Sequence, residues 1–307
     1  MDPTVDITGA TAALRGGGLV ILPTETVYGL AANAGDARAV AAVYAAKGRP
    51  AFNPLIAHVT DVGMARRIAV FDARAERLAA TFWPGPLTLV LPVADATAVC
   101  DLARAGLDTV AVRAPAHPMA RALLEAFGGP LVAPSANRSG RPSPTTFADA
   151  VAETGAQAAA ALDGGPCAIG LESTVIALLD EARLLRPGAV TRAQIEALIG
   201  PLSEAQADAK RSPGRLTRHY APNLPLRLNA QTPNADEVWL GFGPMNGAGF
   251  NLSPNSDLAE AAANLFTYLR AADRSDGAAG IAVAPIPDTG LGEAINDRLR
   301  RAAGFVG

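Results

Sequence analysis

Short apolar runs recur along the first part of the chain and are separated by segments with helical spacing. We expect the runs to form strands because Val, Leu and Ile dominate them; they cover residues 19–22, 55–59, 87–91, 109–113, 130–133 and 173–179. Asp36 is a candidate N-cap for a helix that ends at Gly48, residues 117–127 and 147–154 are helical in pattern, and Thr191 caps another helix. The pattern predicts a mixed α/β domain and leaves its topology open.

The periodicity lapses between Gly200 and Asn223, and a long segment of this kind is either a linker or a functional loop. Beyond it, apolar spacing predicts strands at 238–242 and 280–284 and helices at 258–269 and 290–303. Arg298, Arg300 and Arg301 end the last helix and suit the negative end of its dipole. We predict a first domain at 1–200, a linker at 201–223, and a small α/β domain with parallel strands at 224–307.

Composition and charge argue against a nucleic-acid-binding, a secreted or a membrane protein. The 307 residues are 50% hydrophobic, and their net charge of −3 argues against a dedicated nucleic-acid binder, which needs a basic face. The N-terminus lacks a secretory pattern, and the longest apolar stretch, 78–94, is too short and too rich in proline to span a bilayer. Cys100 and Cys167 cannot form a disulfide framework, and we expect both to be buried. A cytoplasmic protein with no membrane partner is predicted.

The segment PTETVYGL, 23–30, is the densest polar cluster and follows the first predicted strand. Its threonines, glutamate and tyrosine are well placed to line a cleft, because α/β sheets bind ligands at strand ends. An ordinary strand-to-helix turn capped by Thr24 or Thr26 explains the same residues equally well.

A second cluster, KGRPAFNP, contains the only lysine other than Lys210. Lys47 and Arg49 flank Gly48, and two cations on a turn with free backbone N–H groups suit a polyphosphate. Asn53 can add an amide contact, and His58 ends the next apolar strand. The alternatives are a basic helix end that answers the helix dipole and a half-buried structural imidazole.

A third cluster, APSANRSGRPSPTT, offers the small donors Ser135, Asn137, Ser139 and Ser143 in a loop that can approach a phosphate closely, although a plain surface turn is also possible. Arg113 closes another strand and can clamp a carboxylate or pair with a neighbouring acid. The sequence has no Walker loop, no GxSxG or GxGxxG motif, and no cysteine or histidine spacing for zinc.

PTETVYGL, KGRPAFNPLIAHV, FWPGPLTLVL, APSANRSGRPSPTT and LESTVI occur in this order, and the whole series resembles the YrdC/Sua-type threonylcarbamoyl-AMP synthases. SPGRLTRHYAP, 212–222, resembles the linker of the longer, two-domain members, apart from residues 215–218. The resemblance implies a YrdC-like twisted mixed α/β sheet with a concave cleft, followed by a small Rossmann-like domain. It also implies a nucleotidyltransferase that converts L-threonine, bicarbonate and ATP into threonylcarbamoyl-AMP, diphosphate and water, for modification of the adenosine next to the anticodon of tRNA.

The resemblance assigns roles to individual residues. It places Lys47 and Arg49 in the catalytic step, and it implies ATP contacts from Lys47, Arg49, Asn53, Thr109, Ser135, Asn137, Ser143, Arg186 (after the last strand of the first domain) and Tyr220 (folded over the nucleotide). It implies threonine contacts from Thr26, His58, Arg113, Ala133, Ser173 and Thr174. No side chain is identified as a metal ligand, and no general base is named.

The expected substrates are ATP with Mg²⁺, L-threonine and bicarbonate, and neither zinc, haem nor flavin is expected. The product is expected to pass to the tRNA threonylcarbamoyl transferase complex, without strong direct binding of nucleic acid by this chain. One alternative is an RNA-binding or ribosome-maturation module, which the acidic balance disfavours. Another is a module of a hydrogenase-maturation enzyme, which would require zinc-finger cysteines and an acylphosphatase-like domain.

Overall fold

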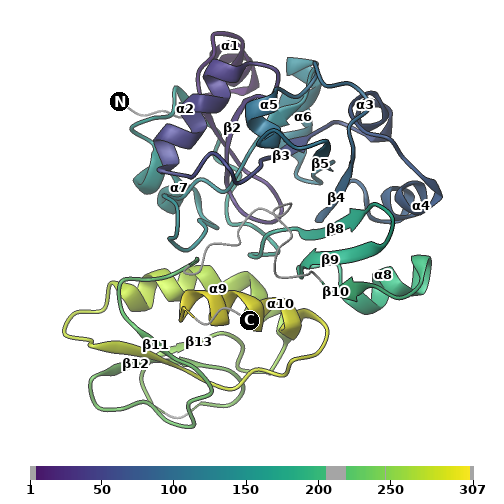
Figure 1. Ribbon diagram of the computed structural model, residues 1–307. Helices are drawn as coiled ribbons and strands as arrows, with labels where there is room; N and C mark the ends of the chain where they lie inside the picture. Colours follow the sequence, from purple (N-terminus) through teal and green to yellow (C-terminus); the bar gives the residue numbers. More distant parts are fainter. Residues whose placement is uncertain (1–4, 205–218, 246, 305–307) are drawn as a thin grey trace.

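The computed structural model describes residues 5–204, 219–245 and 247–304, which form two α/β domains (Figure 1). The first domain is built on a twisted ten-stranded mixed sheet. Its strands, in their order across the sheet, are β10 (Ser203–Glu204), β9 (Ala182–Arg186), β8 (Thr174–Leu178), β4 (Leu87–Pro92), β5 (Thr109–Arg113), β3 (Ile56–His58), β6 (Leu131–Val132), β2 (Gly29–Asn33), β1 (Val20–Leu22) and β7 (Ala160–Ala161). Its helices are α1 (Ile7–Arg15), α2 (Ala37–Lys47), α3 (Val62–Ile68), α4 (Ala73–Phe82), α5 (Asp101–Arg104), α6 (Pro118–Phe127), α7 (Phe147–Thr154) and α8 (Arg192–Ile199).

The predicted strands all exist, and the predicted caps are confirmed. Asp36 accepts hydrogen bonds from the backbone of α2, and Thr191 forms a capping box with Gln194 at the start of α8. The predicted strand-to-helix turn after the first strand is wrong, because β1 continues into the antiparallel strand β2 with Val20 opposite Ala31. β2 reads GLAAN and has no β-branched residue, so its sequence carries no strand signal.

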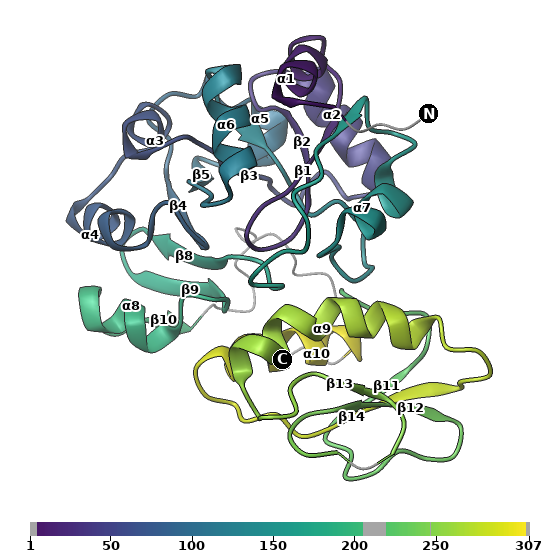
Figure 2. The same cartoon turned by 180° about the vertical axis from the view of Figure 1, so that it is seen from behind.

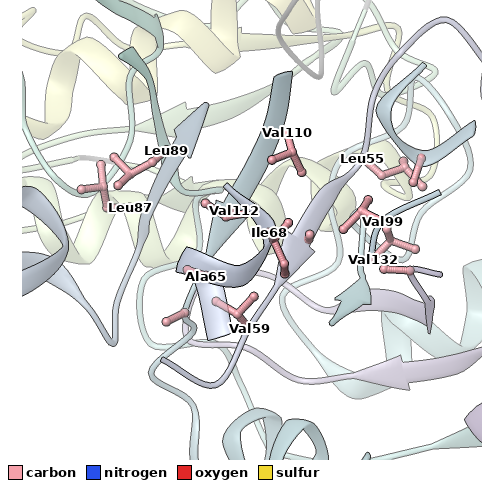
Figure 3. Packing of buried hydrophobic residues seen from close by; sticks show 14 of the residues in the cluster. Leu55, Val59, Ala65, Ile68, Leu87, Leu89, Val99, Val110, Val112 and Val132 are labelled. Atoms are coloured by element: carbon pink, nitrogen blue, oxygen red, sulfur yellow. The ribbon is translucent and has the colours of Figure 1, made fainter. Parts of the chain in front are cut away.

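Helices cover the two faces of this sheet unequally, and this difference creates the site. One face packs against α2, α3, α4 and α8 in the main core, where residues such as Leu89, Val112 and Ile68 are buried (Figure 3). Burial of each such side chain contributes about 1.5–3 kcal/mol. The opposite face is covered by α1 and α6 only at the β1–β2–β6 end. Over β3, β5 and β8 it carries a small apolar cluster that includes Ile56 and Ala111, and it leaves room for a pocket.

The second domain has a four-stranded sheet in the order β11 (Leu226–Arg227), β14 (Gly280–Val283), β12 (Glu237–Gly241) and β13 (Phe250–Asn251), and every pair is parallel, as predicted. α9 (Leu258–Asp273) and α10 (Leu291–Ala302) lie between this sheet and the first domain (Figures 1 and 2). β10 belongs to the first sheet although it falls in the predicted linker, 201–223. Residues 205–218 are outside the described part, so the domain boundaries stay predictions.

Ion pairs join the two domains across α9 and α10. Arg270 on α9 reaches Glu153 on α7, with 2.8 Å between Nη1 and Oε1. Arg298 on α10 reaches Glu172, 2.9 Å between Nε and Oε2. The dipole interpretation of Arg298 is therefore wrong: its side chain is fully buried and leaves its own helix to meet a carboxylate of the other domain.

Candidate active site

A pocket opens on the uncovered face of the first sheet, and its empty space, including the part open to solvent, is about 520 Å³. Its lining comes from the β1–β2 loop, the segment after α2, β3, the ends of β5 and β9, the segments after β6 and before β8, and residues 219–220, which precede β11. The lining includes nine of the predicted site residues, namely Thr26, Arg49, His58, Arg113, Ala133, Ser135, Ser173, Arg186 and Tyr220.

The end of α2 supplies the cationic side of the pocket. Gly48 has a φ of 59°, and this left-handed turn ends the helix and separates Lys47 from Arg49. The Lys47 ammonium donates to the backbone carbonyls of Ser135 and Asn137, which brings the four predicted phosphate-binding residues into one cluster. The Arg49 guanidinium donates to the carbonyls of Asn53, at 3.3 Å, and Pro54, at 3.2 Å.

Burial lowers the pKa values of both Lys47 and Arg49. It lowers the pKa of Arg49 to about 10, and burial together with the Arg49 charge holds the pKa of Lys47 well below its ordinary value. Nearby, the buried side-chain oxygens of Asn53 and Asn137 have no hydrogen-bond partner within the described residues. A buried acceptor without a partner is costly, so these two oxygens suit a hydrogen-bond donor or a hard cation, whereas Lys47 and Arg49 suit the negative charge of a ligand.

Arg113 forms a second cationic point at the C-terminal end of β5. Its guanidinium donates to the Thr26 hydroxyl at 3.0 Å, to a Glu25 carboxylate oxygen at 2.6 Å and to the Gly85 carbonyl at 3.2 Å. Burial acts to raise the pKa of Glu25, but the Arg113 charge and the hydrogen bonds outweigh it and lower that pKa. A guanidinium fixed on three sides in this way can present its remaining surface to a ligand carboxylate.

His58 lies beside Arg113, because the two are paired residues of the parallel strands β3 and β5. Burial and the Arg113 charge lower the pKa of His58 to about 3. The imidazole is therefore neutral at physiological pH and can make hydrogen bonds to a ligand without adding charge.

The buried histidines give a prediction about stability. Burial also lowers the pKa of His219 to about 3, so between about pH 6.5 and 3 the unfolded chain binds protons that the folded chain does not. Stability is therefore full above that range and falls with decreasing pH, by about 1.4 kcal/mol per pH unit for each histidine. We expect urea unfolding to show this loss between pH 7 and pH 5, and His58→Gln to reduce its slope by about one proton. An identical slope in the wild type and His58→Gln would contradict the assignment.

A buried network forms the wall opposite Lys47 and Arg49. Glu172 accepts a hydrogen bond from the Ser143 hydroxyl and pairs with Arg298. Ser173 accepts from the Arg186 guanidinium at both its carbonyl, at 3.0 Å, and its hydroxyl, at 3.1 Å. Burial acts to raise the pKa of Glu172, but Arg298, Arg186 and the Ser143 hydrogen bond lower it to about 2, so this carboxylate stays ionised.

Tyr220 and His219 complete the pocket from the segment that leads into the second domain. The Tyr220 ring is buried against Phe266 on α9, with 5.4 Å between ring centroids. The Ala221 N–H donates to the Gly140 carbonyl at 2.7 Å, which ties this segment to the third sequence cluster. Residues 212–218 of the segment that resembles the linker lie outside the described residues, and the expected cover of Tyr220 over the nucleotide stays a prediction.

Five other predicted residues do not line the pocket themselves: Lys47, Asn53, Asn137, Ser143 and Thr174. Lys47, Asn53 and Ser143 contact residues that do, namely Ser135, Arg49 and Glu172. The Thr174 hydroxyl donates to the Val190 carbonyl at 2.7 Å, so it serves the backbone. Thr109 also falls outside the lining; it shares a sheet face with Arg113 but begins β5, about 13 Å away along the strand. Arg186 is the last residue of β9, so its predicted place after the last strand of the first domain is corrected.

Glu172 and His219 line the pocket but were not singled out from the sequence, and Glu25, expected only as part of a segment that lines a cleft, supports the pocket by pairing with Arg113. Each adjoins a residue that was singled out, and each acid stands in an otherwise uncharged motif, PTETVYGL or LESTVI. A single acid in such a motif could have indicated a buried ion pair, but its arginine partner could not be identified because it is far away in the sequence. Cys167 is buried as expected, whereas Cys100 is half-buried, and both are free.

Within the described residues, no group of three or more histidine, cysteine, aspartate or glutamate side chains is arranged to hold a metal ion. Over the same residues, no helix is both long and apolar enough to cross a membrane.

Comparisons with known proteins agree with this architecture. The family model described as "Telomere recombination" matches residues 12–188, and the model "Threonylcarbamoyl-AMP synthase, C-terminal domain" matches residues 190–304. The fold and pocket thus define a two-domain α/β enzyme of the nucleotidyltransferase type.

Two relatives match almost the full chain. The threonylcarbamoyl-AMP synthase of Bacillus subtilis (strain 168) is 40% identical over 97% of this chain and 93% of its own length. That of Pyrococcus abyssi is 39% identical over 96% and 93%. The crystal structure of P. abyssi Sua5 complexed with L-threonine superposes with a TM-score of 0.90, covering 97% of this chain and 94% of that chain. The chain belongs to the threonylcarbamoyl-AMP synthase family, and it is an enzyme that makes threonylcarbamoyl-AMP.

Proposed function

We propose that the pocket beneath Tyr220 is where this chain condenses L-threonine, bicarbonate and ATP into threonylcarbamoyl-AMP, releasing diphosphate and water. One observation carries the assignment: the pocket has two separate cationic points, Arg49 with Lys47 behind it, and Arg113. The two points match the two anionic parts of the substrates, a triphosphate and an amino-acid carboxylate.

ATP is assigned to the side of Lys47 and Arg49. These cations, together with Arg186 across the pocket, supply positive charge for the phosphates. Ser135, Asn137 and Asn53 supply short polar groups, and the unpartnered amide oxygens of the two asparagines gain partners when a ligand is present. Ser143 acts by holding Glu172, and the buried Tyr220 ring covers the nucleotide.

Threonine is assigned to the side of Arg113. Its guanidinium would bind the carboxylate, and Thr26 and Ser173 would offer hydroxyls to the amino acid. His58 would remain neutral and add a hydrogen bond, and Ala133 would contribute only its backbone.

The chemistry follows from these positions. The threonine amine and bicarbonate form a carbamate and water, and a carbamate oxygen then attacks the α-phosphorus of ATP. A new P–O bond forms, the bond to the β-phosphate oxygen breaks, and diphosphate leaves with the electron pair. Negative charge is crowded throughout, so fixed cations in a site shielded from water contribute the largest stabilisation. Holding the carbamate beside the nucleotide adds rate through orientation.

Mg²⁺ is proposed to enter as MgATP, as part of the substrate. Amide and phosphate oxygens are hard ligands of the kind that Mg²⁺ prefers, and the free Asn53 and Asn137 oxygens fit that chemistry.

The product is proposed to pass in the cytoplasm to the proteins that transfer the threonylcarbamoyl group to tRNA. The net charge of −3 supports hand-over through a protein rather than strong direct binding of tRNA.

The test is diphosphate release by the purified chain with MgATP, omitting threonine and bicarbonate in turn. We expect release only when both are present. Release without threonine would point to a different acceptor or to simple ATP cleavage. ATP binding without any release would favour a binding module instead.

A further inference from the structure

Arg298 on α10 is a fully buried charge at the boundary between the domains. Its guanidinium donates to Glu172 at 2.9 Å, to the Pro187 carbonyl at 2.9 Å and to its neighbour Asp297 at 2.8 Å. Glu172 and Pro187 belong to the first domain, so this one side chain of the second domain reaches into the other.

Glu172 lines the pocket, and both of its carboxylate oxygens are held from outside it. One accepts from Ser143 and the other from Arg298. Glu172 stands immediately before Ser173, whose carbonyl and hydroxyl receive the Arg186 guanidinium. A shift of Glu172 would therefore move the wall that carries Arg186.

Arg298 also contacts the Tyr220 ring, with 5.4 Å between its guanidinium carbon and the ring centroid. The ring is thus held between Arg298 on α10 and Phe266 on α9. The backbone N–H of His219 donates to a carbonyl of α10, that of Arg301, at 3.3 Å. Through these contacts the second domain fixes a wall of the pocket that belongs to neither sheet.

We propose that Arg298 is a positioning residue through which the second domain shapes the nucleotide side of the pocket, by holding Glu172 and the Tyr220 ring in place. The inference rests on the proposed assignment of ATP to that side. It gives the second domain a role in ATP binding without any contact between Arg298 and substrate, since Arg298 is absent from the pocket lining.

A matched pair of variants tests the proposal in the full-length chain. Arg298→Lys keeps the charge but cannot hold three partners in the same fork geometry. Arg270→Lys makes the same change in another buried interdomain pair, whose acid, Glu153, does not line the pocket. KM for ATP, KM for threonine and kcat are measured by diphosphate release, and the thermal midpoint reports the folded state.

We expect Arg298→Lys to raise KM for ATP about tenfold or more, because a charge-assisted hydrogen bond to the wall is lost. KM for threonine should rise much less, because Ser173 adjoins Glu172 but Arg113, the proposed carboxylate contact, is held by other residues. Arg270→Lys should leave both constants unchanged even where it lowers the thermal midpoint. An unchanged KM for ATP in Arg298→Lys, or equal increases for both substrates, would overturn the proposal.

A second variant covers the case in which Arg298→Lys does not fold. In Glu172→Gln/Arg298→Met neither Glu172 nor Arg298 is left as an unpaired charge, and Asp297 keeps its pair with Arg301 at 2.9 Å. The double variant should also bind ATP about tenfold more weakly in calorimetry, since Arg298 no longer holds the wall. Wild-type affinity would overturn the inference. Calorimetry needs no turnover, so this result is separate from any failure of the wild type to make threonylcarbamoyl-AMP.

Discussion

Replacing Arg49 by alanine is expected to reduce diphosphate release about 100-fold or more, as happens when a group that stabilises transition-state charge is removed. The guanidinium is fixed at the pocket wall by the Asn53 and Pro54 carbonyls, so no neighbouring side chain can take its position. Its pKa of about 10 leaves it charged at physiological pH. Lys47→Ala should have a similar effect, because Lys47 also holds the Ser135 and Asn137 backbone.

Arg38→Ala is the matched control, since Arg38 is an exposed arginine in the first turn of the same helix, α2. It should retain wild-type activity, and all three variants should remain folded by thermal unfolding. Full activity in Arg49→Ala would remove Arg49 from the reaction and with it the assignment of the phosphates to this side of the pocket.

Arg113→Lys is expected to raise KM for threonine about 100-fold, in line with the cost of truncating one partner of a buried charged pair. A lysine ammonium cannot contact Glu25, Thr26 and the Gly85 carbonyl and still bind a carboxylate in two places. Lysine keeps the charge next to Glu25, so the variant avoids leaving an unpaired buried carboxylate. KM for ATP should change little, because the nucleotide is assigned to the other cationic point.

The control is Arg66→Lys, which makes the same change in an exposed ion pair on α3, where Arg66 lies 2.7 Å from Glu76. Both kinetic constants should stay at their wild-type values there, because exposed pairs contribute little. If Arg113→Lys instead raised KM for ATP and left KM for threonine unchanged, the assignments of ATP and threonine to the two ends of the pocket would have to be exchanged.

Local signals predicted much of the fold. The Asp36 cap and the left-handed Gly48 fix both ends of α2, and these features depend only on neighbouring residues. β2 and β9 were missed for local reasons as well: GLAAN consists mainly of small residues, and ARLLR has no β-branched residue and only two large apolar residues, between arginines. Each becomes a strand by antiparallel pairing with the strand just before it along the chain, β1 for β2 and β8 for β9, although neither segment carries a strand signal of its own.

The candidate site was also predicted only in part, because some of its contacts join residues that lie far apart in the sequence. Lys47, Arg49 and Ser135 stand in dense motifs and could be singled out from the sequence. Glu25 and Glu172 could not be given roles, because their arginine partners are 88 and 126 residues away. Arg298 was misinterpreted because a basic residue near a helix end has a ready local explanation, and only the docking of α10 on the first domain shows another.

In the buried Glu172–Arg298 pair, the negative charge belongs to the first domain and the positive charge that balances it belongs to the second. Without Glu172, Arg298 would keep only Asp297 as an acidic partner, and without Arg298, Glu172 would lose the cation that holds one of its oxygens, so neither can be exchanged freely while the other stays. The two positions should therefore change together over evolutionary time. A descendant that lost α10 would need a neutral residue at position 172 or a new cation from elsewhere, so this contact constrains the exchange of second domains between distant relatives.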